Sequence, residues 1–277
     1  MQLKKWSSLF VAAGLAVALV GCGEDKKEAA APAPAAKAEA TTIVVGASPV
    51  PHADILKFVQ PALEKEGVNL KIVEFSDYIK PNLSLADKEL DANFFQHKPY
   101  LDEFAKARGL KLAVLASVHL EPMGVYSTKV KNVNDLKEGA KVAIPNDPTN
   151  GGRALKVLET AGLIKVKPEA GVLATVADVI DNPKKLQFAE IEAAQLPRAL
   201  PDVDAAVINS NFALGANLNP TKDAIAVESK DSPYANIVVV REGDNREALQ
   251  KLKAALTTED VKKFLETQYK GAVLPAF

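Results

Sequence analysis

The chain has 277 residues, of which 48% are hydrophobic, and its 34 Lys and Arg nearly balance its 35 Asp and Glu. This length and apolar content are enough for one large or two medium-sized domains with their own hydrophobic cores. The formal net charge of −1, without any basic block, argues against nucleic acid as a partner.

Residues 1–21 have the pattern of a signal peptide. Two lysines precede an apolar run, residues 9–20, which is too short for a mature membrane-spanning helix but typical of a signal-peptide core. The run ends in LVGC, which looks like a bacterial lipobox and predicts cleavage before Cys22 and a diacylglycerol on its sulfur. An ordinary secretory signal followed by an incidental cysteine is the alternative. Because Cys22 is the only cysteine of the chain, we expect no intramolecular disulfide.

Residues 22–41 follow as a segment rich in Ala, Pro, Lys and Glu. Such a composition cannot bury enough apolar surface to fold, so we expect a flexible tether between the lipid and the globular part. The protein is therefore expected in the bacterial cell envelope, attached to a membrane by its lipid and facing the periplasm or the cell exterior. The sequence leaves open which membrane carries it.

From residue 42 onward, strand-like and helix-like segments alternate, which predicts an α/β layered fold with largely parallel sheets. Extended segments are expected at residues 41–48, 68–75, 92–96, 110–130, 186–192 and 223–241, and at the end of 133–145 and the start of 204–218. Helices are expected at residues 52–67, 82–91, 99–109, 152–164 and 193–203, at the start of 133–145, at the end of 204–218, and twice within 245–269.

Two long extended segments, residues 112–128 and 223–241, predict two lobes joined by two crossing strands. The first lobe would contain residues 42–121 together with 237–277, and the second residues 122–236. A cleft between two lobes is a common place for a small-molecule site.

The stretch NDPTNGGRAL lies between a strand-like run, residues 142–144, and a helix-like pattern that begins at Arg153. A strand, a glycine-containing loop and a helix often form a cradle for an anion, because free N–H groups and the helix dipole face the loop. The stretch has neither the GxxxxGK[ST] nor the GxGxxG frame, which excludes the common nucleotide-binding loops.

The individual residues of this stretch suggest a clamp for a carboxylate. Thr149 or Asn150 could cap the helix, and Gly151 and Gly152 could let the backbone approach a ligand. Arg153 could then form a bidentate pair with the carboxylate. The alternative is an ordinary helix cap followed by a solvated arginine.

Several polar and aromatic residues are further candidates. Asn209 and Asn236 lie near the ends of extended segments, where an amide could bind a ligand, although turn or capping roles are favoured by the residues alone. In the extended run that contains Phe95, successive side chains point to opposite faces. Phe95 therefore shares one face with His97, and Phe94 shares the other with Gln96. One face should belong to the core and the other to the cleft, and we interpret Phe94 as a core residue.

Metal binding and catalysis have no support in the sequence. The three histidines, His52, His97 and His119, are not spaced as a metal site, and we interpret His52 as a helix-entry residue and His119 as structural. No GxSxG, HExxH or Cys–His arrangement is present, so we expect no enzyme activity and no cofactor. Asp147 is interpreted as a residue that caps or holds its loop.

Eight ordered segments between residues 43 and 277 resemble the NlpA-type lipoproteins, the methionine-binding receptors of bacterial ABC importers. The segments are GASPVPHADIL, FSDYIKPN, DANFFQHKPYL, IPNDPTNGGRAL, NPKKL, QLPRAL, AVINSNFA and DSPYANIVVVR. The resemblance implies a two-lobed type II periplasmic-binding-protein fold that closes on its ligand and delivers it to an ABC permease.

The resemblance also assigns roles to residues. It implies that Arg153 binds the α-carboxylate of methionine and that Asn209 and Asn236 bind its ammonium and carboxylate groups. It further implies that the methionine side chain is enclosed by Tyr78, Phe95, His97 and Tyr100. D-methionine, a methionine-containing dipeptide or another apolar amino acid remain alternative ligands, and an adhesin-like lipoprotein or a periplasmic enzyme remain alternative functions.

Overall fold

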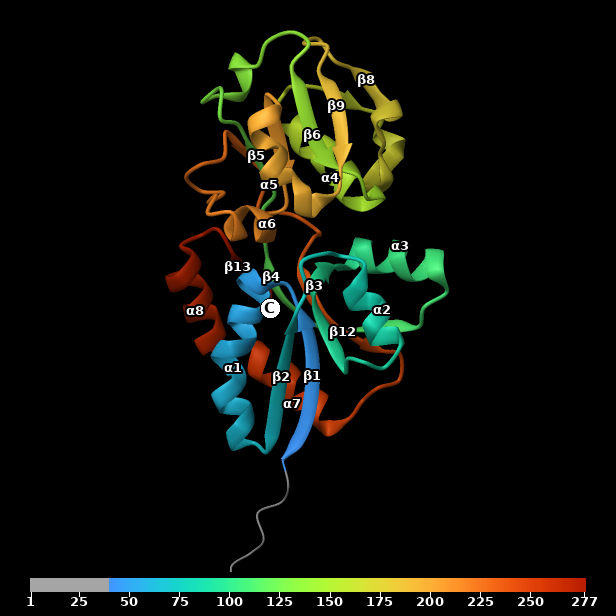
Figure 1. The fold of residues 1–277 in the computed structure, drawn as a ribbon, viewed down its shortest axis with the longest axis vertical. Coiled ribbons are helices and arrows are strands. Elements are labelled where there is room, and N and C mark those ends of the chain that lie inside the picture. The colour runs from blue at the N-terminus through green and yellow to red at the C-terminus, as the bar shows by residue number, and fades with distance from the viewer. Residues whose placement is uncertain (1–39) are drawn as a thin grey trace, which may run out of the picture. The chain divides into compact units, whose positions relative to one another are not determined.

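Two β-sheets form the framework of residues 40–277, the part of the chain that the computed structural model describes (Figure 1). The predicted signal peptide, the lipidation of Cys22 and most of the predicted tether lie outside these residues. Among the described residues, no helix is both long enough and apolar enough to cross a membrane.

The first sheet, sheet A, has six strands in the order β13-β4-β12-β3-β1-β2. These strands are β1 (Thr41–Ala47), β2 (Val68–Glu74), β3 (Ala92–His97), β4 (Leu112–Leu120), β12 (Asn236–Arg241) and β13 (Leu274–Pro275). β1 pairs in parallel with β2 and β3, whereas β12 runs antiparallel to β3 and β4.

The second sheet, sheet B, has five strands in the order β11-β5-β10-β6-β9. They are β5 (Gly124–Tyr126), β6 (Lys141–Pro145), β9 (Gln187–Ile191), β10 (Ala205–Ile208) and β11 (Ala226–Val227). β6 pairs in parallel with β9 and β10, but β5 is antiparallel to β10 and β11. Two further strands, β7 (Lys165–Val166) and β8 (Val179–Asp181), form a separate pair.

The prediction of largely parallel sheets is therefore wrong for five strands, β4, β5, β11, β12 and β13, whose pairings are all antiparallel. β5 and β12 enter their sheets directly after the chain has crossed from the other sheet (Figure 1). They start at the edge where β1, β3, β6 and β10 end, and so they run in the opposite direction.

Helices cover both sheets. The α-helices are α1 (Asp54–Lys65), α2 (Lys80–Ala86), α3 (Lys98–Arg108), α4 (Pro148–Thr160), α5 (Leu196–Ala199), α6 (Ser210–Gly215), α7 (Glu247–Leu256) and α8 (Glu259–Tyr269). Short helical turns are η1 (Pro49–Ala53), η2 (Val133–Asp135), η3 (Pro168–Leu173), η4 (Val176–Asp178), η5 (Ala193–Gln195) and η6 (Leu200–Asp202). The helix expected at the start of 133–145 is only the turn η2, because the backbone already leaves the helical region at Leu136, with φ −59° and ψ 127°.

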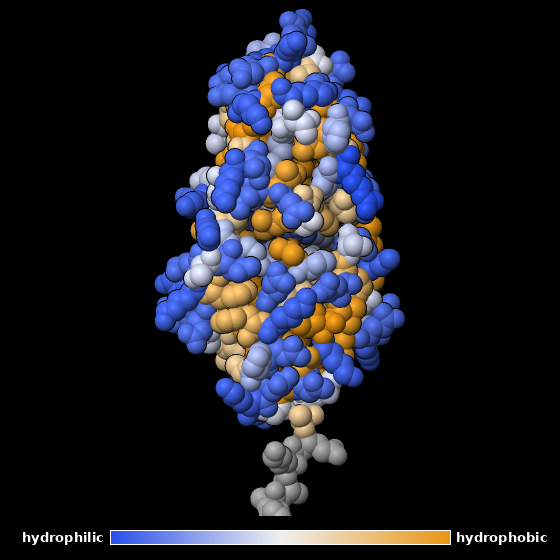
Figure 2. Space-filling model, turned by 60° about the vertical axis from the view of Figure 1, so that its left-hand side comes forward, coloured by the Kyte–Doolittle hydropathy of each residue, from blue (hydrophilic) through white to orange (hydrophobic). Residues whose placement is uncertain are grey.

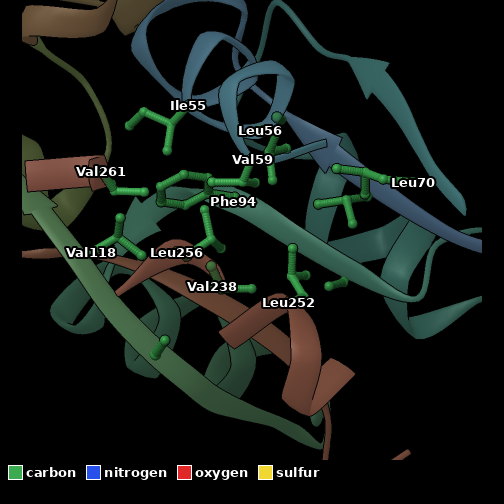
Figure 3. Close-up of a cluster of buried hydrophobic side chains, with 14 of the residues drawn as sticks. Ile55, Leu56, Val59, Leu70, Phe94, Val118, Val238, Leu252, Leu256 and Val261 are labelled. Atoms are coloured by element: carbon green, nitrogen blue, oxygen red, sulfur yellow. The ribbon is translucent and has the colours of Figure 1, made fainter. Parts of the chain in front are cut away.

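The main core of sheet A lies against α1, α7 and α8. Apolar residues from one face of each helix, such as Leu56, Leu252 and Val261, meet Phe94 and Val238 of the sheet (Figure 3). This confirms the prediction that Phe94 belongs to the core. The surface in Figure 2 carries many hydrophilic residues, with apolar residues in patches between them.

The chain crosses between the sheets twice, through residues 121–123 and 228–235. Both crossings are irregular, so the predicted continuous strands over 112–128 and 223–241 are each interrupted. The strand on either side of a crossing belongs to a different sheet, and Pro122 and Pro233 have no backbone N–H for a ladder bond.

Candidate functional site

The ends of several elements meet around one cavity. The space between its side chains, including the part that is open to solvent, is about 330 Å³. Seven of its lining residues are the predicted ligand-binding residues, Tyr78, Phe95, His97, Tyr100, Arg153, Asn209 and Asn236. The sequence did not predict ligand binding for the other five, which are Gln96, Glu121, Asn150, Ser210 and Asn211. The structure thus brings the predicted residues together, while their contact with a ligand stays a prediction.

The topology explains why these residues meet. β3, β6 and β10 end where the two sheets approach each other, and the chain continues from each of them into a helix (Figure 1). His97 ends β3, Arg153 lies in the second turn of α4, and Asn209 follows β10 directly. The carboxyl ends of parallel strands are the usual place for ligand sites in α/β sheets.

Asp147 is the N-cap of α4, and its Oδ1 accepts a hydrogen bond from the backbone N–H of Asn150 at 3.0 Å. The prediction that Thr149 or Asn150 caps the helix is therefore wrong, whereas the capping role of Asp147 is confirmed. Pro148 suits the first helical position and the aspartate precedes it, so α4 starts well before Arg153. Because a carboxylate already occupies this N-terminus, the expected backbone cradle for an anion does not form there.

The two glycines of α4 allow close packing within the protein. A Cβ on Gly152 would lie 2.5 Å from the carbonyl oxygen of Val172 and 3.1 Å from the nitrogen of Ala174. A Cβ on Gly151 would lie 3.0 Å from the carbonyl oxygen of Pro145. The predicted role is corrected accordingly, since these glycines let α4 approach η3 and the end of β6 rather than a ligand.

A chain of hydrogen bonds fixes the direction of three side chains. The backbone N–H of Tyr100 donates to His97 Nδ1 (3.2 Å), so the ring carries its proton on Nε2, which donates to Asn150 Oδ1 (3.2 Å). Asn150 Nδ2 donates to the carboxylate of Asp147 (3.0 Å), and Asn209 Nδ2 donates to Asn150 Oδ1 (2.8 Å). The amide oxygen of Asn209 is then left buried without a partner among residues 40–277. Asn209 therefore offers an unsatisfied acceptor.

Arg153 is the only Lys or Arg among the described residues that line the cavity. Its Nε donates to Glu228 Oε1 (3.0 Å), and its Nη2 donates to Glu228 Oε2 (2.5 Å) and to the carbonyl oxygen of Glu121 (2.7 Å). The guanidinium also lies over the ring of Tyr234, with Cζ 4.4 Å from the centroid. The predicted bidentate pair is thus formed with Glu228 inside the protein, and the sequence did not predict this partner.

Aromatic rings form one wall of the cavity. The ring of Tyr78 lies 5.8 Å from both Phe95 and Tyr100, and 4.8 Å from Phe212, measured between centroids. The hydroxyl of Tyr78 donates to Asn211 Oδ1 (2.5 Å), and that of Tyr100 donates to the carbonyl oxygen of Tyr78 (2.8 Å). Burial raises the pKa of Tyr78 well above its usual value, so its hydroxyl remains a donor. The wall is therefore apolar with satisfied polar ends.

Two histidines and a glutamate meet behind the cavity, which the sequence spacing did not predict. Nε2 of His119 lies 2.7 Å and Nε2 of His52 3.3 Å from Glu121 Oε1, and His52 Nε2 is also 2.9 Å from Asn236 Oδ1. Burial raises the pKa of the Glu121 carboxyl. All three side chains are buried, and sequence reasoning could not find them because His52 lies on a different segment from His119 and Glu121.

This trio offers three possible metal-ligand atoms within 4.8 Å of one another. A metal-bound histidine normally donates its other N–H to a second acceptor. Nδ1 of His52 and Nδ1 of His119 have no hydrogen-bond partner among residues 40–277. The donor set therefore fits two neutral imidazoles, His119 bonded to the carboxylate and His52 bonded to Asn236, better than it fits a metal ion.

Acid is expected to destabilise the protein between about pH 6.5 and pH 4. Burial lowers the pKa of His52 to about 4 and the pKa values of His97 and His119 to about 3, and these are all the histidines of the chain. In this window the unfolded chain binds protons on its histidines and the folded protein does not. The free energy of unfolding therefore decreases as the pH is lowered. Each histidine should lower the free energy of unfolding by about 2 kcal/mol between pH 7 and pH 5, partly offset by the raised pKa of Glu121.

Urea unfolding at the two pH values measures this change. His119→Gln keeps an N–H donor for Glu121 and should remove about a third of the histidine contribution. Equal stability of the wild-type protein at pH 7 and pH 5 would contradict the buried neutral state of these rings.

A comparison with known proteins finds a matching family and close relatives. A family model described as NlpA lipoprotein matches residues 43–277. The chain is 45% identical to the "Probable D-methionine-binding lipoprotein MetQ" of Pasteurella multocida, over 98% of this chain and 99% of that protein. It is 42% identical to the "D-methionine-binding lipoprotein MetQ" of Escherichia coli K12, over 94% of this chain and 89% of that protein.

Solved structures show the same architecture. A nutrient binding protein from Burkholderia cenocepacia bound to methionine is 50% identical, with a TM-score of 0.82, covering 85% of this chain and all 100% of that chain. The methionine binding protein MetQ is 40% identical, with a TM-score of 0.83, covering 85% of this chain and 98% of that chain. The predicted α/β fold class is thereby confirmed.

Proposed function

Because this chain belongs to the NlpA lipoprotein family, we propose that it binds methionine outside the cytoplasm and delivers it to an ABC importer. The observation that carries the proposal is the pairing of one cation, Arg153, with one unsatisfied buried acceptor, Asn209 Oδ1, in a single cavity. These groups are complementary to the α-carboxylate and the α-ammonium of an amino acid. Membership of this family also agrees with the expectation that the chain binds its ligand without converting it.

Asn236 would complete the recognition of the ligand backbone. Its Oδ1 is engaged by the N–H of His52, at 2.9 Å, which leaves the Nδ2 donor for the ligand carboxylate. We therefore assign the ammonium to Asn209 and the carboxylate to Arg153 and Asn236. This division goes beyond the sequence, which left open which asparagine holds which group.

The aromatic wall supports a thioether side chain. Tyr78, Phe95, Tyr100 and His97 present ring edges and faces to the same cavity. Each sulfur–aromatic contact contributes about 0.3–1.5 kcal/mol, which an isosteric hydrocarbon chain would not gain in full. The names of the Pasteurella and Escherichia relatives and the methionine-bound Burkholderia structure point to the same ligand.

Calorimetry on protein that has been unfolded and refolded to remove carried-over ligand tests this function. L-methionine, D-methionine, a methionine-containing dipeptide and norleucine are titrated in parallel. We expect methionine to bind at least several-fold tighter than norleucine. The proposal fails if neither enantiomer of methionine gives heat or raises the melting temperature while another solute does. Mass spectrometry of the ligand released on unfolding identifies that solute.

Attachment and transport belong to the same proposal. We propose that Cys22 carries the lipid and that residues 42–121 with 237–277, and residues 122–236, act as two lobes around the cavity. The hydrogen bonds Tyr78 Oη to Asn211 Oδ1 (2.5 Å) and His97 Nε2 to Asn150 Oδ1 (3.2 Å) would hold the lobes closed. Cys22→Ala should shift the protein from the membrane to the soluble envelope fraction, without changing the affinity of the purified protein for methionine.

Asp147→Ala should affect both stability and binding. Loss of this N-cap is expected to lower the free energy of unfolding by about 1 kcal/mol. It also removes the acceptor that orients Asn150, and through it Asn209, so methionine affinity should fall. Thr258→Ala is the matched control, because Thr258 Oγ1 caps α8 through the N–H of Val261 (3.3 Å). The control should lower stability alone, and equal affinities of the two variants would contradict the orienting role of Asp147.

A further inference from the structure

The environment of Arg153 points to a residue that no motif identifies. Glu228 lies 75 positions away in the sequence and accepts from both Nε (3.0 Å) and Nη2 (2.5 Å) of the guanidinium. Arg153 is 3% exposed and the Glu228 side chain 11%, so this ion pair is largely removed from water. A bidentate pair of this kind fixes the plane of the guanidinium.

Glu228 is itself held in place by the chain around the crossings. The backbone N–H of Met123 donates to Oε2 (3.1 Å), and the hydroxyl of Ser232 donates to Oε1 (3.2 Å). Together with the two bonds from Arg153, the carboxylate accepts four hydrogen bonds. Both crossing segments, residues 121–123 and 228–235, therefore contribute to the position of this carboxylate.

This arrangement decides which part of Arg153 is available. Nε and Nη2 are engaged by Glu228 and by the carbonyl oxygen of Glu121. Nη1 forms no hydrogen bond with any of residues 40–277, and Arg153 lines the cavity. A ligand carboxylate would therefore meet Nη1, at an angle that Glu228 sets.

The same carboxylate changes the charge of the site. Arg153 is the only cation among the described lining residues, and Glu228 cancels its charge at hydrogen-bond distance. His97 is neutral because burial lowers its pKa to about 3. Glu121, the acid that lines the cavity, already accepts from His119 and lies 3.3 Å from His52 Nε2. A ligand thus meets no excess positive charge.

We propose that Glu228 orients Arg153 and cancels its charge, and that the site thereby selects zwitterionic amino acids over carboxylates that lack an ammonium group. The inference rests on the proposed amino-acid binding function. An uncompensated arginine would attract any carboxylate, whereas a compensated one favours a ligand that brings its own positive charge for the acceptor on Asn209. Glu228 is a positioning and specificity residue that need not touch the ligand.

The test is the ratio of two dissociation constants, that of 4-(methylsulfanyl)butanoate divided by that of methionine. The first compound is methionine without its ammonium group. In Glu228→Gln, Arg153 keeps its charge and loses its counterion, so the ratio should fall at least about tenfold. In Glu228→Asp the charge stays but the carboxylate is displaced, so both ligands should bind about threefold to thirtyfold more weakly at an unchanged ratio.

Glu138→Gln is the matched control, because it removes an equally charged carboxylate from an exposed ion pair with Lys185. It should leave both dissociation constants at wild-type values. Thermal unfolding of each ligand-free variant shows whether it is folded. A purely structural role of Glu228 would weaken both ligands alike in Glu228→Gln and leave the ratio unchanged.

Three results would overturn the inference. They are an unchanged ratio in Glu228→Gln, wild-type affinities in Glu228→Asp, and tighter methionine binding in either variant, which would make Glu228 a competitor for Arg153. If Glu228→Gln does not fold, the Glu228→Asp result decides. If wild-type protein binds methionine and the ratio is unchanged, this inference fails and the proposed function stands. If it binds no amino acid, both fail.

Discussion

Arg153→Ala is expected to weaken methionine binding by about a hundredfold or more. Removing one partner of a buried, hydrogen-bonded charge pair costs about 2–5 kcal/mol, and about 1.4 kcal/mol corresponds to a factor of ten in affinity. Arg153 is the only cation among the described residues that line the cavity, so no neighbouring lysine or arginine there can replace it. Calorimetry of the refolded, ligand-free variant measures the loss.

Two further variants separate charge from geometry at this position. Arg153→Lys keeps the charge but cannot form the bidentate pair with Glu228, so it should bind methionine more tightly than Arg153→Ala and more weakly than the wild type. Arg153→Ala also leaves Glu228 without its cation, so the free energy of unfolding must be measured alongside. Near wild-type affinity in Arg153→Ala would rule out Arg153 as the carboxylate-binding residue.

Glu121→Ala is expected to lower the free energy of unfolding by about 3–5 kcal/mol. The Glu121 side chain is 5% exposed, accepts a hydrogen bond from the Nε2–H of His119 and lies 3.3 Å from His52 Nε2. Its removal leaves the buried Nε2–H of His119 without an acceptor and a cavity next to the His52 ring at the first crossing segment. Urea unfolding at pH 7 measures the change, and ligand affinity should fall as well because His52 also positions Asn236.

Glu121→Gln is the control for Glu121→Ala. It keeps one acceptor oxygen and nearly the same volume, so it should cost less than half as much stability. If Glu121→Ala unfolds within about 1 kcal/mol of the wild type, the His119 N–H group has another acceptor and the described network does not carry stability.

The candidate site shows how far local patterns reach. The strand-to-helix pattern around NDPTNGGRAL placed Arg153 in the cavity, although the helix cap and the role of the glycines were wrong. The alternation along β3 separated Phe94, which lies in the core, from Phe95, which lies in the cavity wall. These features depend on neighbours within a few residues, which periodicity and capping rules describe. The resemblance to the family, and not the alternation, assigned the aromatic residues to the ligand.

The sequence by itself determined the class of fold, the family and most of the side chains that line the cavity. Alternating strand and helix patterns and an ordered set of motifs are sufficient for these, because each is encoded in a short segment. Only the tertiary structure decided which groups pair with one another. The contact of Glu121 with His119 is local in sequence. Three others join segments that are distant in sequence: Arg153 with Glu228, Asn236 with His52, and Glu121 with His52. Such pairs form where the crossing segments bring strand ends together, so they depend on the packing of both sheets rather than on any local pattern.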